Sequence, residues 1–292
     1  QGYTNITVAG AHGKTTTTAM IVDMLRRAGR RPAYIIGGRV HGYPSSGSLG
    51  DGKLLVTEVD ESDGTQELLK SSVAVVTNVE DDHCWRLGGV PALQQCFRQF
   101  ALQAPSLVTL DSAQMRELFS DHPDAAFVSP QHVIAAPGSR IQGTHNHENA
   151  SLAITALTRV RIGFNPSAAA RLLNEFPGIE RRLSVRYSSA DQNVLIVEDY
   201  AHHPTELRAA LRTLRTMYPA YHLAAVFQPH RYERVKRFGD QFALNLEAAD
   251  RVVVVPPFSA WMKNAQIADA RRIAETCRAC PCTYWEGSYH QL

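Results

Sequence analysis

Short apolar segments and longer amphipathic segments alternate along most of the chain. The short segments have the length of buried strands, and the longer ones carry apolar residues at helical spacing. This alternation is typical of a mostly parallel sheet covered by helices, because parallel strands need crossover connections. The sequence therefore predicts an α/β fold. The expected strands are residues 6–9, 54–58, 73–77, 107–110, 194–199, 223–227, 251–255 and 283–285, and the expected helices are residues 15–27, 91–103, 146–161, 166–176, 204–217 and 234–246.

A length of 292 residues is typical of about two domains. Pro177-Gly178 breaks the predicted helix 166–176, and we place the domain boundary there. Residues 1–178 and 179–292 are therefore predicted to be separate domains. A strand pattern that starts almost at residue 1, and a last strand with little after it, indicate part of a longer protein whose second domain is incomplete.

Charge and hydropathy argue against two classes of partner. The 30 basic and 28 acidic residues give no broad positive surface for nucleic acid or anionic lipid. No apolar run approaches the roughly 18 residues of a membrane span, and no leader pattern precedes the first strand. We therefore expect a cytoplasmic protein with neither partner. The five cysteines indicate reduced thiols, with a zinc site at Cys277, Cys280 and Cys282 as the weaker alternative because no fourth ligand is nearby.

A glycine-rich turn lies between the first expected strand and the first expected helix. It reads Gly10-Ala11-His12-Gly13-Lys14-Thr15. Glycines let backbone N–H groups close on phosphate oxygens, a lysine reaches the terminal phosphates, and a threonine hydroxyl is a ligand for Mg²⁺. The strand, turn and helix together predict a nucleoside triphosphate site. The alternative is a glycine turn that precedes Lys-Thr by chance.

Only two residues separate the glycines of this turn, whereas the usual phosphate loop has four. With Thr16 and two more threonines after it, the variant resembles the Mur ligases, which use ATP to build peptidoglycan stem peptides. The resemblance implies that residues 10–16 bind ATP and that Thr15 also binds Mg²⁺. It further implies a central domain of the phosphate-loop type followed by a Rossmann-like domain for the amino acid.

Two acidic runs downstream continue the resemblance. Residues 58–63 and 77–83 are similar to runs in the alanine-adding member of the family. There the matching glutamate and histidine bind two Mg²⁺ ions, so Glu58 and His83 are the expected metal ligands. A carboxylate at a strand end suits Mg²⁺, and histidine is a less usual ligand. Taken alone, Glu58 is more simply interpreted as a solvent-exposed residue at a strand end, and His83 as a histidine in a loop.

A helix start and a hinge follow in the family's order. Residues 145–149 fit the family pattern His-Asn-x-x-Asn, which implies that His145 and Asn149 hold the adenine, while Asn146 is equally well a helix cap. Residues 177–182 resemble the hinge into the last domain, where the second arginine, Arg182, meets the nucleotide. A charge pair at a surface turn is the alternative for this arginine.

The most specific match lies in the second expected domain. Residues 198–206 and 227–234 are similar to two runs that line the amino-acid pocket of the alanine-adding member. An arginine fork suits a small carboxylate because it bonds both oxygens at once. A plain turn at the adjacent histidines is the alternative. The match assigns Asp199 to ATP, and Tyr200, His202, Arg231 and Arg234 to L-alanine.

The resemblance extends to about Val255 and weakens in two places. Cys84-Trp85 stands where the family usually has an acidic residue, which puts the shape of the muramyl-facing loop in question. Residues 258–261 depart from the family's Tyr-x-Ala-Gly-Glu pattern, so no role is assigned there.

The resemblance implies an amide ligase. ATP would phosphorylate the lactyl carboxylate of UDP-N-acetylmuramate, with Lys14 and two Mg²⁺ ions neutralising charge, and L-alanine would attack the acyl phosphate. His202 is the candidate proton acceptor. Family members hold UDP on an additional amino-terminal domain, expected upstream or on another chain, so we expect little ligation from this chain alone.

Two other functions stay open on the sequence. One is a sister ligase that attaches a preformed peptide to the same acceptor; Glu61-Ser62-Asp63 and the run from Phe227 to Arg231 favour the alanine-adding enzyme over it. The other is a nucleotide-binding module without catalysis, which the altered Cys84-Trp85 site and the missing UDP-binding domain support.

Overall fold

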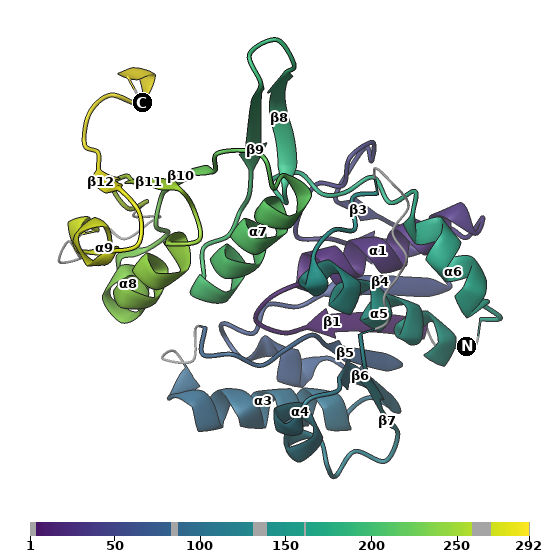
Figure 1. Cartoon of the computed structure of the whole chain (residues 1–292). Helices are drawn as coiled ribbons and strands as arrows, with labels where there is room; N and C mark the ends of the chain where they lie inside the picture. Colours follow the sequence, from purple (N-terminus) through teal and green to yellow (C-terminus); the bar gives the residue numbers. More distant parts are fainter. Residues whose placement is uncertain (1–3, 83–86, 131–138, 161, 259–269, 292) are drawn as a thin grey trace. The chain divides into compact units, whose positions relative to one another are not determined.

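The computed structural model describes residues 4–82, 87–130, 139–160, 162–258 and 270–291. The chain divides into two compact units, residues 1–184 and residues 185–292 (Figure 1). The hinge-like Pro177-Gly178 therefore lies shortly before this division. Within the described residues, no helix is both long enough and apolar enough to cross a membrane.

The first unit is built on one sheet whose strand order is β3-β2-β4-β1-β5-β6-β7. Every pairing is parallel except that of β2 with β3. β1 lies in the middle, and its register pairs Val8 with Glu58 of β4 and Ala9 with Val76 of β5. The carboxyl ends of these three strands are therefore neighbours. The strands are β1 (Thr4–Ala9), β2 (Ala33–Ile35), β3 (Gly47–Ser48), β4 (Leu54–Glu58), β5 (Val73–Val76), β6 (Ser106–Leu110) and β7 (Ala125–Val128).

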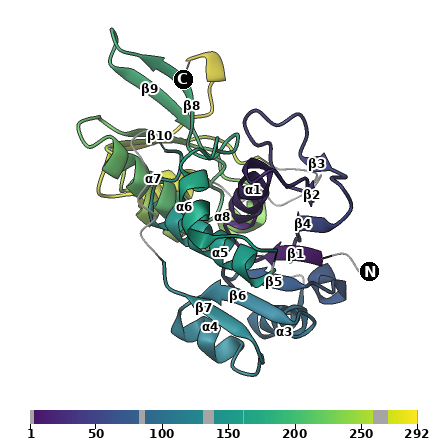
Figure 2. The same ribbon diagram turned by 90° about the vertical axis from the view of Figure 1, so that its right-hand side faces the viewer.

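Helices cover both faces of this sheet (Figures 1 and 2). One face packs against α1 (Lys14–Arg27), α5 (Thr144–Arg159) and α6 (Pro166–Leu173), and the other against α3 (Val90–Leu102) and α4 (Ala113–Leu118). A 3₁₀ turn, η1 (Thr65–Leu68), precedes β5. The central strands are buried on both sides, which explains their continuous apolar sequences.

The second unit has a three-stranded parallel sheet, in the order β10-β11-β12, and a separate two-stranded sheet of β8 and β9. Its core joins the parallel sheet to apolar residues of three helices. The elements are β8 (Ser184–Ser189), β9 (Val194–Glu198), α7 (Pro204–Met217), β10 (Ala224–Phe227), α8 (Tyr232–Leu246), β11 (Arg251–Val254), α9 (Arg271–Thr276), β12 (Cys282–Tyr284) and η2 (Tyr289–Gln291).

The predicted α/β fold with a mostly parallel sheet is confirmed, but the strands β2, β3, β7 and β8 and the helices α4 and α9 were not predicted. Two of the predicted elements also end early. The helix expected over residues 166–176 ends at Leu173, because the next three N–H groups bond to carbonyls only three residues back. The strand expected over residues 194–199 ends at Glu198 and pairs with β8, outside the parallel sheet.

Candidate functional site

The glycine-rich turn lies at the carboxyl end of β1 and leads directly into α1. Gly10 and Gly13 have φ angles of 137° and 81°, in the region that favours glycine. A Cβ atom on Gly10 would lie 2.0 Å from Thr77 Oγ1, and one on Gly13 would lie 2.4 Å from Asn149 Oδ1. Both positions therefore favour glycine for conformation, and Gly10 also requires it for space because the backbone of Asn78 lies within 3.0 Å of the added atom.

The end of β5 holds the turn in place. Asn78 accepts a hydrogen bond from His12 N at 2.9 Å through Oδ1 and donates one to His12 O at 3.0 Å through Nδ2. Thr77 Oγ1 also donates to His12 O, at 2.6 Å. Ala11 N donates to the Asn78 carbonyl at 3.2 Å. These bonds fix the backbone of the turn.

The ammonium group of Lys14 is folded back into the turn. Its Nζ lies 2.5 Å from Gly10 O and 2.7 Å from Glu61 Oε2. Glu61 is 1% exposed, and its burial raises the pKa of the carboxyl although the Lys14 charge lowers it. Glu61 thus forms an ion pair that holds the Lys14 ammonium group in the turn, a role that the sequence analysis did not assign.

Thr15 lies beside the carboxylate at the end of β4. Its Oγ1 donates to Glu58 Oε2 at 2.9 Å, and Gly37 N donates to Glu58 Oε1. Burial raises the pKa of Glu58, while these hydrogen bonds and the charges of Lys14 and Arg182 lower it. Arg182 follows Ile179, which pairs with Val40, three residues after Gly37.

The geometry of this region suits a Mg²⁺-bound triphosphate. In the described structure no side chain caps the N-terminus of α1 and its first turn has no acidic residue. The first N–H groups of a helix attract anions. Lys14 adds a positive charge next to them, and the Thr15 hydroxyl and Glu58 carboxylate form an adjacent pair of hard oxygen ligands.

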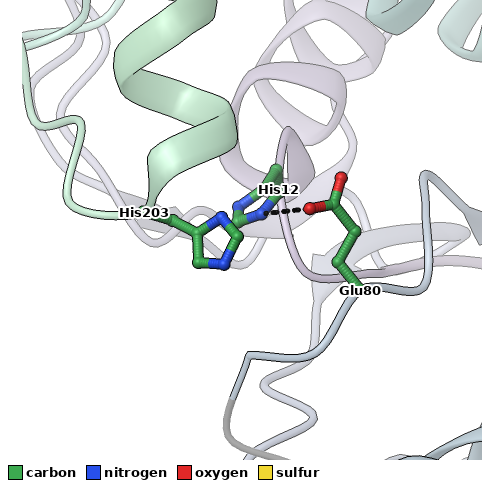
Figure 3. A group of neighbouring side chains, drawn as sticks. All are labelled: His12, Glu80 and His203. Carbon is green, nitrogen blue, oxygen red and sulfur yellow. Dashed lines mark ion pairs between the residues drawn. The ribbon is translucent and has the colours of Figure 1, made fainter. Parts of the chain in front are cut away.

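His12 points out of the turn toward Glu80, which follows β5 (Figure 3). Its Nε2 lies 3.5 Å from Glu80 Oε2, an ion pair when the imidazole is protonated. His12 is 9% exposed. Its imidazole therefore lies at the buried edge of the turn, and its backbone carries the bonds to Asn78.

Among the residues expected to hold adenine, Asn149 reaches the turn. Its Oδ1 accepts from Thr17 Oγ1 at 3.2 Å, and it lies against Gly13. His145 lies in the first turn of α5 and is partly buried. Asn146 donates to Gln142 O at 2.9 Å, and Gly143 occupies the N-cap position, so the alternative of Asn146 as the helix cap is wrong.

In the second unit, two of the residues assigned to L-alanine lie together after β9. The rings of Tyr200 and His202 are 4.9 Å apart. His202 Nδ1 lies 2.9 Å from Tyr200 O and 3.4 Å from Glu206 Oε2. Both neighbours are acceptors, so a hydrogen on Nδ1 satisfies both of them. Asp199 accepts a hydrogen bond from Ala201 N at 2.8 Å.

His230 joins this group to the start of α8. Its ring lies 5.7 Å from that of His202, and Arg234 Nη1 lies 3.3 Å from its Nδ1. Arg234 is 1% exposed, so its guanidinium is buried beside the imidazole. Arg231 is the N-cap residue of α8, with φ 68°. A role for His230 was not predicted, although it lies inside the matching run.

The structure thus brings together Lys14, Thr15, Glu58, Asn149 and Arg182 in the first unit. It separately groups Tyr200, His202 and Arg234 in the second. His83 and the Cys84-Trp85 substitution lie outside the described residues. Glu61 and Asn78 also belong to the first group; their only signal in the sequence is their place inside the two acidic runs. The roles of all these residues stay predictions.

Replacing Glu58 with glutamine is expected to stabilise the first unit by about 1 kcal/mol at neutral pH, because it removes a buried negative charge. Gains of this size are usual when a functional residue that destabilises the fold is replaced. The pKa of Glu58 is raised in the folded state, so the free energy of unfolding decreases as pH rises through that pKa and the carboxyl ionises. Glutamine stays neutral and keeps both hydrogen bonds, by accepting from Gly37 and donating to Thr15. Urea unfolding between about pH 5 and 8 should show a gain that grows with pH, and the exposed control Glu117→Gln should show none.

Two family profiles match the chain. The Mur ligase middle domain matches residues 8–128, and the glutamate ligase domain of Mur ligases matches residues 181–290. The first match contains the turn, Glu58 and Glu61, and the second contains the group around His202. The two profiles follow each other in the order of the two compact units.

Curated relatives are named UDP-N-acetylmuramate–L-alanine ligase. The protein of Psychrobacter sp. is 33% identical over 306 residues, covering 94% of this chain and 64% of the relative. That of Gloeobacter violaceus is 35% identical over 289 residues, covering 90% and 62%. The chain therefore spans less than two thirds of the length of these relatives.

Solved structures share the fold. The UDP-N-acetylmuramate–alanine ligase of Thermotoga maritima has a TM-score of 0.77 at 24% identity, covering 98% of this chain and 67% of that one. The folylpolyglutamate synthase of Mycobacterium tuberculosis, complexed with ADP, has a TM-score of 0.71 at 16% identity, covering 98% and 81%. The profiles and the curated relatives show that this chain belongs to the Mur ligase family, with the middle domain followed by the glutamate ligase domain.

Proposed function

We propose that this chain is the ATP-using part of a cytoplasmic ligase that joins L-alanine to UDP-N-acetylmuramate through an acyl phosphate, in peptidoglycan synthesis. The observation that supports it most is the cluster of Lys14, Thr15 and Glu58 at the neighbouring ends of β1 and β4. The names of the curated relatives support the choice of substrates. A UDP-binding domain, upstream or on another chain, stays a prediction.

The residues of the turn would bind and neutralise the triphosphate. The N–H groups at the start of α1 would contact phosphate oxygens, and Lys14 would move from Gly10 O and Glu61 to the terminal phosphate. Thr15 and Glu58, with His83 as a predicted further ligand, would hold Mg²⁺, which when bound supplies positive charge against the phosphate oxygens. Asn149 and His145 would position the adenine, and Arg182 and Asp199 would add contacts to ATP.

The amide bond forms when the alanine amine attacks the activated carbonyl carbon and phosphate leaves. The attacking nitrogen must lose a proton. The contacts of Nδ1 with Tyr200 O and Glu206 orient the imidazole of His202, and we assign this side chain as the proton acceptor. Tyr200, Arg231 and Arg234 are proposed to receive the amino acid, and the buried Arg234 would do so while bonded to His230.

Phosphate release from ATP tests the proposal. The chain, supplied with the UDP-binding domain of a curated relative, is incubated with ATP, Mg²⁺ and UDP-N-acetylmuramate, and single amino acids or a tripeptide are then added. We expect release that depends on both the nucleotide sugar and L-alanine. Release that responds to the tripeptide alone would instead identify a peptide-adding ligase. Tight ATP binding without release in any mixture would identify a binding module.

A further inference from the structure

Three cysteines lie close together in the last part of the second unit, and none of them is assigned to the proposed reaction. Cys277 is the C-cap residue of α9, and Cys282 is the first residue of β12. The sulfur atoms of Cys277 and Cys280 are 3.6 Å apart. Cys277 is 7% exposed, whereas Cys280 and Cys282 are partly exposed. One buried thiol therefore lies next to one that solvent can reach.

The turn between the two thiols is held by α8. Glu247, the C-cap residue of this helix, accepts hydrogen bonds from Arg278 N at 2.6 Å and Ala279 N at 3.2 Å. Cys277 also packs into the core of the unit with Ile273 and Ala274. The backbone between the two cysteines is thus anchored to α8, and the 3.6 Å between the sulfurs must shorten to about 2 Å for a disulfide to form.

The spacing of the thiols argues against a metal site. Across the described residues, no group of three ligand atoms that includes a cysteine lies within 4.8 Å. A structural zinc site needs four ligands in a compact tetrahedron. A pair of sulfurs in contact, with a third thiol nearby, fits disulfide chemistry better.

We propose that Cys277 and Cys280 are a redox modification site. When the site reacts with a low-molecular-weight disulfide, a reversible disulfide bond forms between these two residues. The Cys280 thiolate attacks the reagent disulfide, forms a mixed disulfide and releases one small thiolate. The Cys277 thiolate then attacks Cys280 Sγ and releases the second. Two cysteine thiols are oxidised, one reagent disulfide is reduced to two thiols, and both protons pass to the released thiolates through solvent. The proposal does not depend on the ligase function.

The surroundings make this reaction slow at neutral pH. Burial, the neighbouring Cys277, and the charges of Glu247 and Asp250 raise the pKa of Cys280 to about 11. Burial and the neighbouring thiols of Cys277 and Cys280 raise the pKa of Cys282 to about 12. Because the thiolate is the nucleophile, we expect the rate to rise about tenfold for each pH unit below that range.

Peptide mapping tests the proposal on the full chain. The reduced protein is incubated with oxidised glutathione, the remaining thiols are alkylated, and trypsin is added. Cleavage after Arg278 separates Cys277 from Cys280. We therefore expect two tryptic peptides joined by a bond that dithiothreitol breaks. Cys96, buried on α3 in the first unit, serves as the internal control and should stay fully alkylatable after unfolding.

Two variants identify the partner of Cys277. Cys282→Ser should keep the linked peptides, and Cys280→Ser should lose them. A link that survives in Cys280→Ser and disappears in Cys282→Ser would overturn the proposed pairing. A stable glutathione adduct without a link, or no reaction even at about pH 9, where thiolate is more abundant, would overturn the site itself. Matching circular dichroism spectra check that both variants fold. If one does not, fragmentation of the linked wild-type peptides shows whether the alkylated residue is Cys282, as the proposal expects, or Cys280, which would overturn the pairing.

Discussion

Replacing Lys14 with methionine is expected to weaken ATP binding by about 100-fold. Hydrogen bonds to charged groups contribute up to about 3 kcal/mol, and each 1.4 kcal/mol is about tenfold in Kd. Methionine keeps the volume of the lysine stem and removes only the ammonium group that lies against Gly10 O and Glu61. Isothermal titration with a non-hydrolysable ATP analogue and Mg²⁺ measures the change. The exposed control Lys53→Met should bind as the wild type does, and unchanged binding by Lys14→Met would contradict the assignment of this turn to ATP.

The same change is expected to destabilise the first unit by about 3 kcal/mol, because it leaves a buried carboxylate without its cation. Glu61 has a raised pKa even with Lys14 present, so the deficit should be largest above that pKa and shrink as pH falls. Adding Glu61→Gln to Lys14→Met should restore much of the stability and none of the ATP affinity. If Glu61→Gln restores ATP binding as well, the loss of affinity in Lys14→Met came from the loss of stability and not from the missing ammonium group.

Much of the first group of residues follows from the order of elements in the sequence. A strand, a glycine turn and a helix place Lys14 and Thr15 at one end of a parallel sheet. A carboxylate that ends the next long strand must reach the same edge, and Glu58 does so because β4 pairs directly with β1. Parallel pairing therefore turns a linear order into a spatial one, which is why Thr15 and Glu58 could be expected to meet.

Other features depend on tertiary contacts that no local pattern encodes. β2 has three residues and β7 begins with two alanines, so neither has the length or composition of a typical strand. The bond from Lys14 to Glu61 joins residues 47 positions apart, and only its burial distinguishes Glu61 from the exposed acidic residues around it. The approach of the His230 ring to that of His202 likewise joins residues that lie far apart in the sequence.

Gly10→Ala is expected to destabilise the first unit by about 3 kcal/mol or more. Gly10 has a φ of 137°, and a residue with a Cβ atom held in this conformation costs about 1 kcal/mol or more of stability. The added methyl would also lie 2.0 Å from Thr77 Oγ1 and 2.9 Å from the Asn78 carbonyl oxygen, and overpacking of this kind costs about 1–3 kcal/mol. Urea unfolding measures the loss, and ATP titration should show weaker binding because the methyl displaces the turn from Asn78.

Gly29→Ala separates the two causes, because Gly29 has φ 75° and nothing lies within 4 Å of an added Cβ. This control should cost only about 1–2 kcal/mol, the usual penalty for the left-handed conformation. Thr77→Ala supplies the second comparison, since it removes the nearest obstructing atom. In that background Gly10→Ala should cost less, yet not become neutral, because the backbone of Asn78 still blocks the methyl. Equal losses for Gly10→Ala and Gly29→Ala would show that the end of β5 does not confine the turn.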